Sequence, residues 1–256
     1  MQHIEHNGKR LNANLNEPID ISIPMVAREG RVAAWYVSPI SIEPVRTNGF
    51  LGSVAEGGAV NFRDIGFNPH GNGTHTECLG HITKEVHSVN QALKQFFFVS
   101  KLITLTPHTV SEEKGWQKPG DKVITKVQLK EALQGKCPEA LILRTLPNGD
   151  FKCVVNYSNT NPPYVEPEAM EHLIELGVKH FLLDLPSVDR EQDGGLMLAH
   201  KAFWQTESAN PRMDCTITEL VYVREEVKDG DYLLNLQFAP FENDASPSRP
   251  VLFKLG

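Results

Sequence analysis

VEPEAMEHLIELGVKHFLLDLPSVD, residues 165–189, is the stretch that decides the fold class. A proline in its first turn, early acidic residues and a terminal glycine predict a helix over Glu166–Gly177. Residues Val178–Leu183 follow at once and predict a buried strand. A helix that leads directly into a buried strand indicates a sheet covered by helices.

Elements of the same two kinds are predicted on both sides of this stretch. Thr125 and Gln128 have the spacing of a capping box, which predicts a helix from Thr125 through Gln134, and a shorter helix is expected over Ser88–Gln95. Strands are predicted at Lys9–Leu15, Ile19–Ile23, Ala34–Val37, Ile42–Arg46, Val60–Gly66, Phe96–Thr106, Ala140–Arg144, Thr216–Val223 and Tyr232–Phe238. Strands dominate early and alternate with helices later, so we expect an α/β or α+β fold in one domain, residues 1–256.

Composition and charge exclude some classes of partner. The chain has 256 residues, 40% hydrophobic and 22% charged, with a net charge of -7. Binding to nucleic acid or to an anionic membrane surface would require clustered lysine and arginine, and no such cluster occurs. We therefore expect a small-molecule substrate, with neither nucleic acid nor a membrane as partner.

The compartment is predicted from the absence of targeting features. The first residues, MQHIEHNGKRLNANLN, are polar and do not resemble a signal peptide. No run reaches the roughly 18 apolar residues of a membrane span. The four cysteines, at 78, 137, 153 and 215, form no CxxC pair, which favours free thiols. A cytoplasmic protein is the expectation.

NPHGNGTHTECLGH, residues 68–81, concentrates coordinating side chains among glycines. It contains His70, His75, Glu77, Cys78 and His81. Imidazole nitrogens and carboxylate oxygens are preferred ligands of zinc and similar divalent ions. Glycines allow the sharp turns and close approach that several ligands around one ion require. A metal site is therefore predicted here, and a polar surface loop with chance histidines is the alternative.

A metal site built by one segment usually needs ligands from elsewhere. His200 stands in GLMLAHKAFW, and Glu219 stands between apolar neighbours in ITELVYV. A carboxylate buried in an apolar strand is costly unless it is paired, and a cation would remove that cost. His200 and Glu219 are thus candidate ligands. Strand alternation that points Glu219 outward is the alternative.

These residues resemble those of the metal-dependent cyclase family, which includes the bacterial kynurenine formamidases and isatin hydrolases. Gly73-Thr74-His75, Glu77 and His81 fall in register with the family motif H-x-G-T-H-x-D-x-P-x-H. Further blocks are similar along nearly the whole chain, in the family's order: IDISIPM, KPGDKVITKVQLKEAL, ALILRT, residues 165–189 and KDGDYLLNLQFAP.

The resemblance implies a swivelling β/β/α domain that assembles as a homo-oligomer, either a dimer or a tetramer. It implies one or two divalent ions, with zinc first and manganese as the alternative. His75 would bind the first ion, His200 the second, and Glu77 would bridge them. Glu219 would contact both ions, and His81 would be the general acid and base.

Three departures from the family motif lie inside residues 68–81. The first histidine of the motif falls on Gly71, so His70, one residue early, is the candidate ligand and Asn72 the other candidate nearby. Glu77 stands where the family has aspartate, and Leu79 stands where it has proline. Cys78 could pack inertly or add a soft ligand.

The function implied is hydrolysis of an amide or ring C–N or C–O bond of a small molecule, as in an arylformamidase. A cyclase or dehydratase acting on a small carbonyl compound would use the same metal, and a degenerate member would bind a ligand without turnover. Both remain alternatives. Trp35, Tyr36 and Phe50 are candidates for an aromatic substrate wall, with ordinary packing as the other interpretation.

Overall fold

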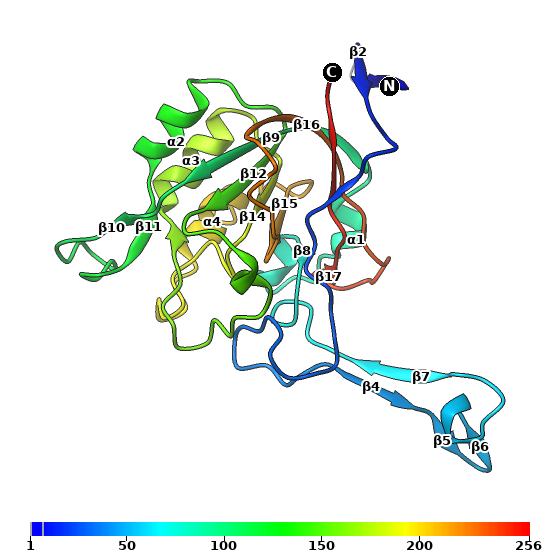
Figure 1. The fold of residues 1–256 in the computed structure, drawn as a ribbon. Helices are drawn as coiled ribbons and strands as arrows, with labels where there is room; N and C mark the ends of the chain where they lie inside the picture. Colours follow the sequence, from blue (N-terminus) through cyan, green and yellow to red (C-terminus); the bar gives the residue numbers. More distant parts are fainter. Residues whose placement is uncertain (1, 7) are drawn as a thin grey trace.

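A nine-stranded sheet runs through the body of the protein (Figure 1). The computed structural model describes residues 2–6 and 8–256. The strand order is β17 (Ala245–Pro247), β8 (His75–Glu77), β15 (Thr216–Glu219), β14 (His180–Leu183), β12 (Ala140–Thr145), β9 (Phe97–Leu105), β16 (Gly230–Asn235), β18 (Val251–Lys254) and β3 (Ile19–Asp20). The four adjacent strands from β15 to β9 are parallel, and the strands outside them are antiparallel.

Helices cover one face of this sheet, and the alternation of side chains along β12 separates two cores. Leu141 and Leu143 pack with the helices α2 (Lys126–Leu133), α3 (Pro167–Glu175) and α4 (Leu198–Trp204) (Figure 1). Ala140 and Ile142 face the second core, formed with β16 and β18. Both β12 and β14 are buried throughout, as expected of parallel strands covered on both faces. The predicted α/β class is confirmed.

Helices α2 and α3 begin and end close to where the sequence predicts. The Thr125 hydroxyl accepts a hydrogen bond from the Gln128 backbone N–H at 3.2 Å, and the Gln128 side chain accepts one from the Thr125 N–H. Pro167 opens α3, and Gly177 follows its end with a φ of 83°. The short helix α1 (Val89–Ala92) is capped by Ser88.

The smaller elements lie around this body. Two-stranded sheets are formed by β1 (Gln2–His6) with β2 (Lys9–Ala13), β4 (Ser41–Pro44) with β7 (Arg63–Gly66), and β5 (Arg46–Thr47) with β6 (Phe50–Leu51). A three-stranded sheet contains β10 (His108–Thr109), β11 (Lys122–Ile124) and β13 (Tyr164–Val165). Short 3-10 turns occur at η1 (Val54–Glu56), η2 (Leu79–His81) and η3 (Asp150–Cys153).

Several predicted elements are wrong or shorter than expected. Ala34–Val37 is a turn rather than a strand, because Trp35 and Tyr36 both have a φ of 57°. The strand predicted over Thr216–Val223 ends at Glu219, because Leu220 is left-handed with a φ of 54°. Others shrink: the Ser88–Gln95 helix to Val89–Ala92 and the Val60–Gly66 strand to Arg63–Gly66. Helix α4 was not predicted.

Two further expectations concern the whole chain. Among the described residues, no helix is both long enough and apolar enough to cross a bilayer. All four cysteines are free thiols, as their spacing predicts.

Candidate metal centre

The pairing of β8 with β15 brings the first site residues together. His75 lies opposite Glu219 in this antiparallel pair, and Glu77 lies opposite Ile217, so the three polar side chains share one face of the sheet. His75 Nε2 lies 3.5 Å from Glu219 Oε2 and 3.9 Å from Glu77 Oε2. Glu219 is only 3% exposed, so the alternative that it points to solvent is wrong.

His200 reaches the same place from the unpredicted helix α4. Asp189 accepts hydrogen bonds from the backbone N–H groups of Ala199 and His200 and from His200 Nδ1, the last at 2.6 Å. The Asp189 carboxylate therefore starts the helix and fixes the imidazole ring. His200 Nε2 is left facing Glu77 Oε1 at 3.0 Å. Asp189 received no role from the sequence, although it closes the family-like block at residues 165–189.

His70, and not its neighbours, completes the cluster on the N-terminal side. A side chain on Gly71 would place its Cβ 2.6 Å from Val37 Cγ2 and 2.7 Å from the Ala34 carbonyl oxygen, so this position admits only glycine. The amide of Asn72 is committed to the Ser38 carbonyl and the Asn68 N–H. His70 Nδ1 lies 3.1 Å from Glu77 Oε2, so the histidine one residue early does reach the site.

His81 lies beside His70 and shares a carboxylate with it. The two rings are stacked, with centroids 4.2 Å apart. Asp244 Oδ2 lies 2.7 Å from His70 Nε2 and 3.5 Å from His81 Nδ1. Sequence reasoning missed Asp244, because only the pairing of β17 with β8 carries this distant residue to the cluster. His81 Nε2 lies 3.9 Å from Glu77 Oε2, and its side chain is 28% exposed.

The buried charged groups of the cluster shift one another's pKa values. Burial would raise the pKa of Glu77, but the nearby His81, His200 and His70 hold it well below its usual value. Burial, together with the negative charge of Glu77, raises the pKa of Glu219. Burial would lower the pKa of His200, but Asp189 and Glu77 hold it well above its usual value. Asp244 and Glu77 likewise outweigh burial and raise the pKa of His70 to about 10.

We expect metal binding to release protons. With a pKa of about 10, His70 holds a proton at neutral pH, and this proton must leave before its nitrogen can bind an ion. Apparent affinity should therefore rise with pH, by about tenfold per unit for each proton displaced. Calorimetric titration of chelator-stripped protein in buffers of different ionisation enthalpy measures the release. An affinity that does not change between about pH 6 and 9 would contradict it.

The donor set fits divalent metal ions. The ligand atoms of His75, Glu77 and Glu219 lie within 4.8 Å of one another, and so do those of His70, Glu77 and His81. His75 Nε2 and Glu77 Oε2 are buried without a hydrogen-bond partner, since the His70 contact lacks the geometry of a hydrogen bond. Buried polar atoms are seldom left unpaired, and nitrogen and carboxylate oxygen suit zinc and manganese. Glu77 belongs to both groups.

Cys78 takes no part in this donor set. Its side chain is fully buried, its thiol donates to the His87 carbonyl oxygen at 3.4 Å, and burial raises its pKa to about 11. The thiolate that a soft ligand requires is therefore disfavoured. Of the two interpretations left by the sequence, inert packing agrees with these contacts.

A cavity of about 400 Å³ opens beside the cluster. It is lined by His70, His81, His200 and Glu219, and by the apolar side chains of Trp35, Val37 and Met197. Trp35 thus stands where an aromatic wall was predicted. Tyr36 is 62% exposed, and its hydroxyl lies 3.0 Å from Asn159 Oδ1 and 3.1 Å from Glu191 Oε1, either of which can accept its one hydrogen. Phe50 lies away from the cavity, edge to face against Phe62, so its predicted role in a wall is wrong.

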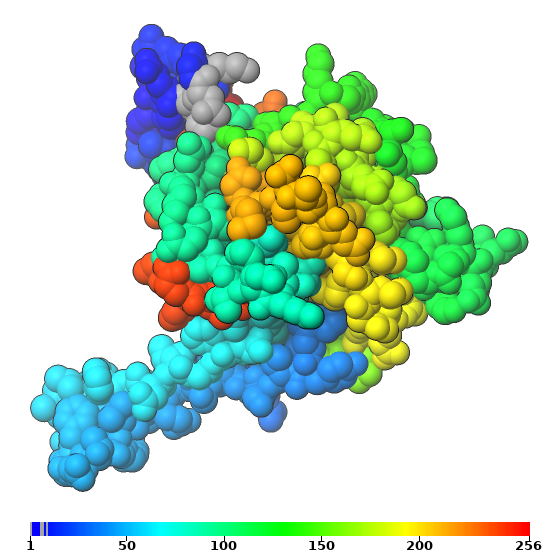
Figure 2. All heavy atoms as spheres, turned by 180° about the vertical axis from the view of Figure 1, so that it is seen from behind, coloured from blue at the N-terminus to red at the C-terminus, as the bar shows by residue number. Residues whose placement is uncertain are grey.

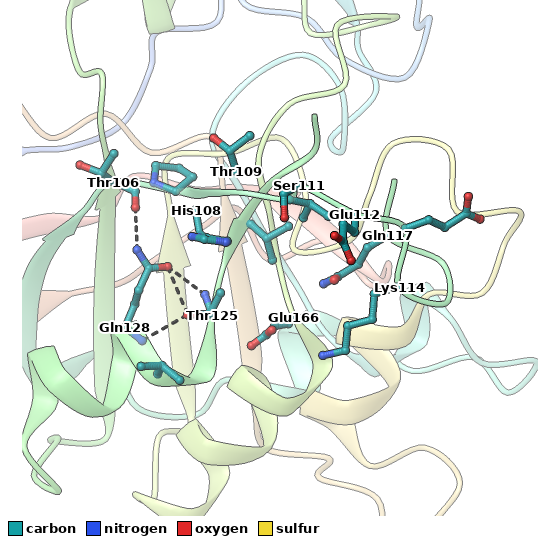
Figure 3. A pocket seen from close by; sticks show the side chains of 15 residues that line it. Thr106, His108, Thr109, Ser111, Glu112, Lys114, Gln117, Thr125, Gln128 and Glu166 are labelled. Carbon is teal, nitrogen blue, oxygen red and sulfur yellow. Dashed lines mark hydrogen bonds between the residues drawn. The ribbon is translucent and has the colours of Figure 1, made fainter. Parts of the chain in front are cut away.

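A larger cleft of about 870 Å³ lies between the β10–β11 segment and the start of α2 (Figure 3). None of the predicted site residues lines it. Its polar groups hold local structure: Gln128 bonds to Thr106 and Thr125, and Glu166 accepts from the Lys126 N–H. The candidate metal ligands therefore lie at the smaller cavity and not at this cleft.

Several known proteins are similar to this chain in sequence or in structure. The kynurenine formamidase of Bacillus anthracis is 27% identical over 239 residues, which are 91% of this chain and 96% of that protein. An isatin hydrolase A from Ralstonia solanacearum superposes with a TM-score of 0.64 at 15% identity, covering 93% of this chain and 91% of that one. A structure named a predicted metal-dependent hydrolase, from Bacillus stearothermophilus, gives 0.61 at 18% identity, covering 93% and 98%.

The solved structures confirm the predicted β/β/α fold. A match to a sequence family shows to which family the chain belongs. The profile of the family named Putative cyclase matches residues 19–190, about two thirds of the chain and all of the segment from β3 to Asp189. The matched range includes the motif residues His75, Glu77 and His81. This chain therefore belongs to the cyclase family.

Proposed function

We propose that this chain, as one domain of residues 1–256, is a metal-dependent hydrolase of the arylformamidase type. It would cleave an amide, or a ring C–N or C–O bond, of a small molecule. The similar proteins named kynurenine formamidase and isatin hydrolase support the reaction class. When bound in this donor set, divalent ions supply Lewis acidity toward a carbonyl oxygen and a water of lowered pKa.

One observation carries the proposal. His75 Nε2 and Glu77 Oε2 are fully buried and have no hydrogen-bond partner, although three further histidines and a second carboxylate surround them. Without a cation, this arrangement leaves two polar atoms unpaired and two carboxylates close together in the protein interior. A pair of divalent ions sharing Glu77 would pair the two polar atoms and offset the charges of the two carboxylates. Zinc is the first choice and manganese the alternative.

The five proposed metal ligands differ in how they are held. His75 donates through Nδ1 to the Gly73 carbonyl oxygen at 3.0 Å, which leaves Nε2 free as a ligand atom. Asp189 holds His200 and Asp244 holds His70 in the same way, each through the ring nitrogen that faces away from Glu77. Carboxylates or carbonyls behind ligating histidines fix the ring and raise its basicity. Glu77 and Glu219 complete the set.

His81 is the proposed general acid and base. It lines the cavity and is held more loosely than His70, with Nδ1 facing Asp244 Oδ2 at 3.5 Å. A proton on Nδ1 directed at this carboxylate leaves Nε2 to exchange a proton with substrate. Such a tautomer suits proton transfer to a leaving nitrogen or oxygen.

The cavity favours a compact substrate with an aromatic part. Trp35, Val37 and Met197 provide apolar wall. The charged side chains at its edge are engaged within the protein: Arg190 by Asp121, Glu191 by the Asn159 and Asn161 N–H groups, and Asp193 by the Gly195 and Met197 N–H groups. Binding would therefore rest mainly on apolar contact with these side chains.

An activity screen tests this function. Chelator-stripped protein, reconstituted with zinc or manganese, is assayed against N-formyl aryl amines, lactams, lactones and isatin-like rings, with product identification. Hydrolysis of at least one aryl amide or ring is expected, and the His75→Ala protein treated alike is the matched control. Cyclised or dehydrated products would favour the cyclase alternative. Substrate binding without any turnover would favour the degenerate member, and both results contradict hydrolysis.

A further inference from the structure

Trp35 is the aromatic side chain in the wall of the cavity, and the backbone that carries it is strained. Trp35 and Tyr36 both have a φ of 57°, in the left-handed region that residues other than glycine rarely adopt. Such a conformation persists only where the surrounding structure holds it. In Figure 2 the blue surface of the segment before residue 40 lies beside the yellow surface near residue 190, and residues of both segments line the cavity. The contacts that hold this turn therefore decide where the aromatic ring stands.

The turn at Trp35 is held by residues 153–158. Four hydrogen bonds of 2.8 to 3.2 Å join the two segments: Val32 N–H to the Cys153 carbonyl, Ala33 N–H to the Val155 carbonyl, Tyr157 N–H to the Ala33 carbonyl, and Tyr36 N–H to Ser158 Oγ. The first three make a short parallel pairing just before the turn, and the fourth lies within it. The place of Trp35 therefore follows the place of residues 153–158.

The 3-10 turn η3, which leads into residues 153–158, is held by a buried lysine rather than by apolar packing. Lys152 is the buried residue of η3 and is 4% exposed. Phe151 beside it is 49% exposed, and Val154 just after η3 is 45% exposed. A surface turn ordinarily does the reverse, because lysine is almost never fully buried unless it is paired. This reversal indicates that the Lys152 ammonium group itself holds the turn in place.

The Lys152 ammonium group ties η3 to the ends of two parallel strands. Nζ donates to the Thr145 carbonyl oxygen at 2.7 Å, to Thr145 Oγ1 at 3.0 Å and to Asp184 Oδ2 at 2.6 Å. The Asp184 carboxylate also accepts from the Thr145 N–H at 2.9 Å and from its hydroxyl at 2.8 Å. Thr145 ends β12, and Asp184 follows the end of β14. All three ammonium hydrogens have acceptors, so these bonds fix the direction of the turn as well as its distance from the sheet.

The same tie relates the aromatic wall to a proposed metal ligand. Asp184 begins the loop 184–189, and the last residue of this loop, Asp189, holds His200 through Nδ1 at 2.6 Å. Trp35 and His200 are thus both positioned from one end of the sheet. Buried ion pairs often stabilise a protein no more than apolar residues of the same volume would, but their directional bonds can specify one arrangement.

We propose that Lys152 is a positioning residue, which sets the place of Trp35 through residues 153–158 and thereby gives the cavity its preference for an aromatic substrate. The aromatic preference rests on the proposed function, whereas the placement of Trp35 does not depend on a metal. Lys152 does not line the cavity and acts only through the turn. Removing its ammonium group should loosen the turn and weaken aromatic binding, while the metal ligands keep their geometry.

Two variants remove the tie. Lys152→Met nearly keeps the length of the side chain but leaves Asp184 buried without its cation, which can unfold a protein. Lys152→Met combined with Asp184→Asn leaves no buried charge and keeps an acceptor for the Thr145 N–H. Arg144→Met is the matched control. Arg144 is also buried near the end of β12 and lies 3.0 Å from Asp229, but it holds the carbonyls of residues 224 and 227, which do not line the cavity.

Amide hydrogen exchange of the metal-free protein, followed by mass spectrometry, tests the placement alone. In both Lys152 variants we expect exchange in residues 32–36 and 153–158 to become at least about tenfold faster, because the paired segments lose their anchor. Exchange in residues 75–77 of β8 should stay as in wild type, and Arg144→Met should leave residues 32–36 unchanged. Unchanged exchange of residues 32–36 in both Lys152 variants would overturn the proposal, and so would equal acceleration in Arg144→Met.

Binding of two small zinc ligands tests the aromatic preference. Benzohydroxamate and acetohydroxamate share the metal-binding group and differ by a ring in place of a methyl group. Zinc-reconstituted wild type should bind benzohydroxamate at least about tenfold more tightly, and both Lys152 variants should lose most of this preference while acetohydroxamate affinity stays within about twofold. Adding Lys152→Met to Trp35→Ala should cause no further loss, because the effect passes through Trp35.

The outcomes of the binding test separate the positioning role from the metal chemistry. A preference for the ring that survives in both Lys152 variants, or that falls further when Lys152→Met is added to Trp35→Ala, would contradict the positioning role. Equal loss in Arg144→Met would also contradict it, because it would show a general loosening of the sheet end. A wild type that binds neither zinc nor a hydroxamate would contradict the proposed function instead, and hydrogen exchange would then decide the role of Lys152.

Discussion

Glutamine in place of Glu77 is expected to abolish metal binding and, with it, turnover. Glu77 is fully buried and is the residue shared by both donor groups. The neutral amide has nearly the same size but cannot offset two divalent charges in the interior. We expect metal content to fall from about two ions per chain to near zero, whereas Thr76→Ser leaves it unchanged. Thr76 is the matched control because it lies next in β8, on the opposite face, bonded to Thr218.

The length of the Glu77 side chain is a second part of this prediction. Strand β8 is fixed on both sides by β15 and β17, and Leu79 packs into the helix-side core. A Cβ on Gly80 would lie 2.3 Å from the His87 carbonyl oxygen, so this segment sits against its neighbour without room to advance. Glu77→Asp shortens the reach by about one bond, and we expect metal affinity to fall at least about tenfold. Equal or tighter binding by Glu77→Asp would contradict this account and favour a decaying site.

Alanine at His81 is expected to reduce turnover by about 10²–10⁴-fold while metal content stays near that of wild type. The side chain lines the cavity, is partly exposed and has longer contacts with Glu77 and Asp244 than His70 has. His108→Ala is the control, because His108 is an exposed histidine on β10, outside the cluster. Metal content and steady-state rates are measured on the same preparations. Loss of metal as complete as in His75→Ala would make His81 a ligand instead.

The sequence predicts those parts of the fold that local patterns determine. The apolar run 140–143 is typical of a covered strand, and the Thr125–Gln128 capping box marks the start of a helix. Helix α4 escaped prediction because its start depends on Asp189, ten residues before Ala199, and on a left-handed Met197. Trp35 and Tyr36 are likewise left-handed, a conformation that their residue types do not suggest.

The sequence predicts which residues form the candidate site, but it does not predict every carboxylate that holds their side chains in place. His70, His75, Glu77, His81, His200 and Glu219 all meet in one cluster, because the motif and its distant partners lie on adjacent strands and a covering helix. Asp244 carries no sequence signal, since only tertiary pairing gives it a position. The exposure of Phe62 and Ile65 could not be predicted either, because their residue types are those of an ordinary buried strand.

The metal content of wild-type protein tests the central claim most directly. Protein purified without an affinity tag is stripped with chelator, reconstituted with zinc or manganese, freed of excess metal and analysed by elemental mass spectrometry. Ions held by His70, His75, Glu77, His200 and Glu219 predict about two per chain in wild type and almost none in Glu77→Gln. Less than about 0.2 ion per chain in wild type, under conditions that saturate a site of three or four ligands, would contradict the account.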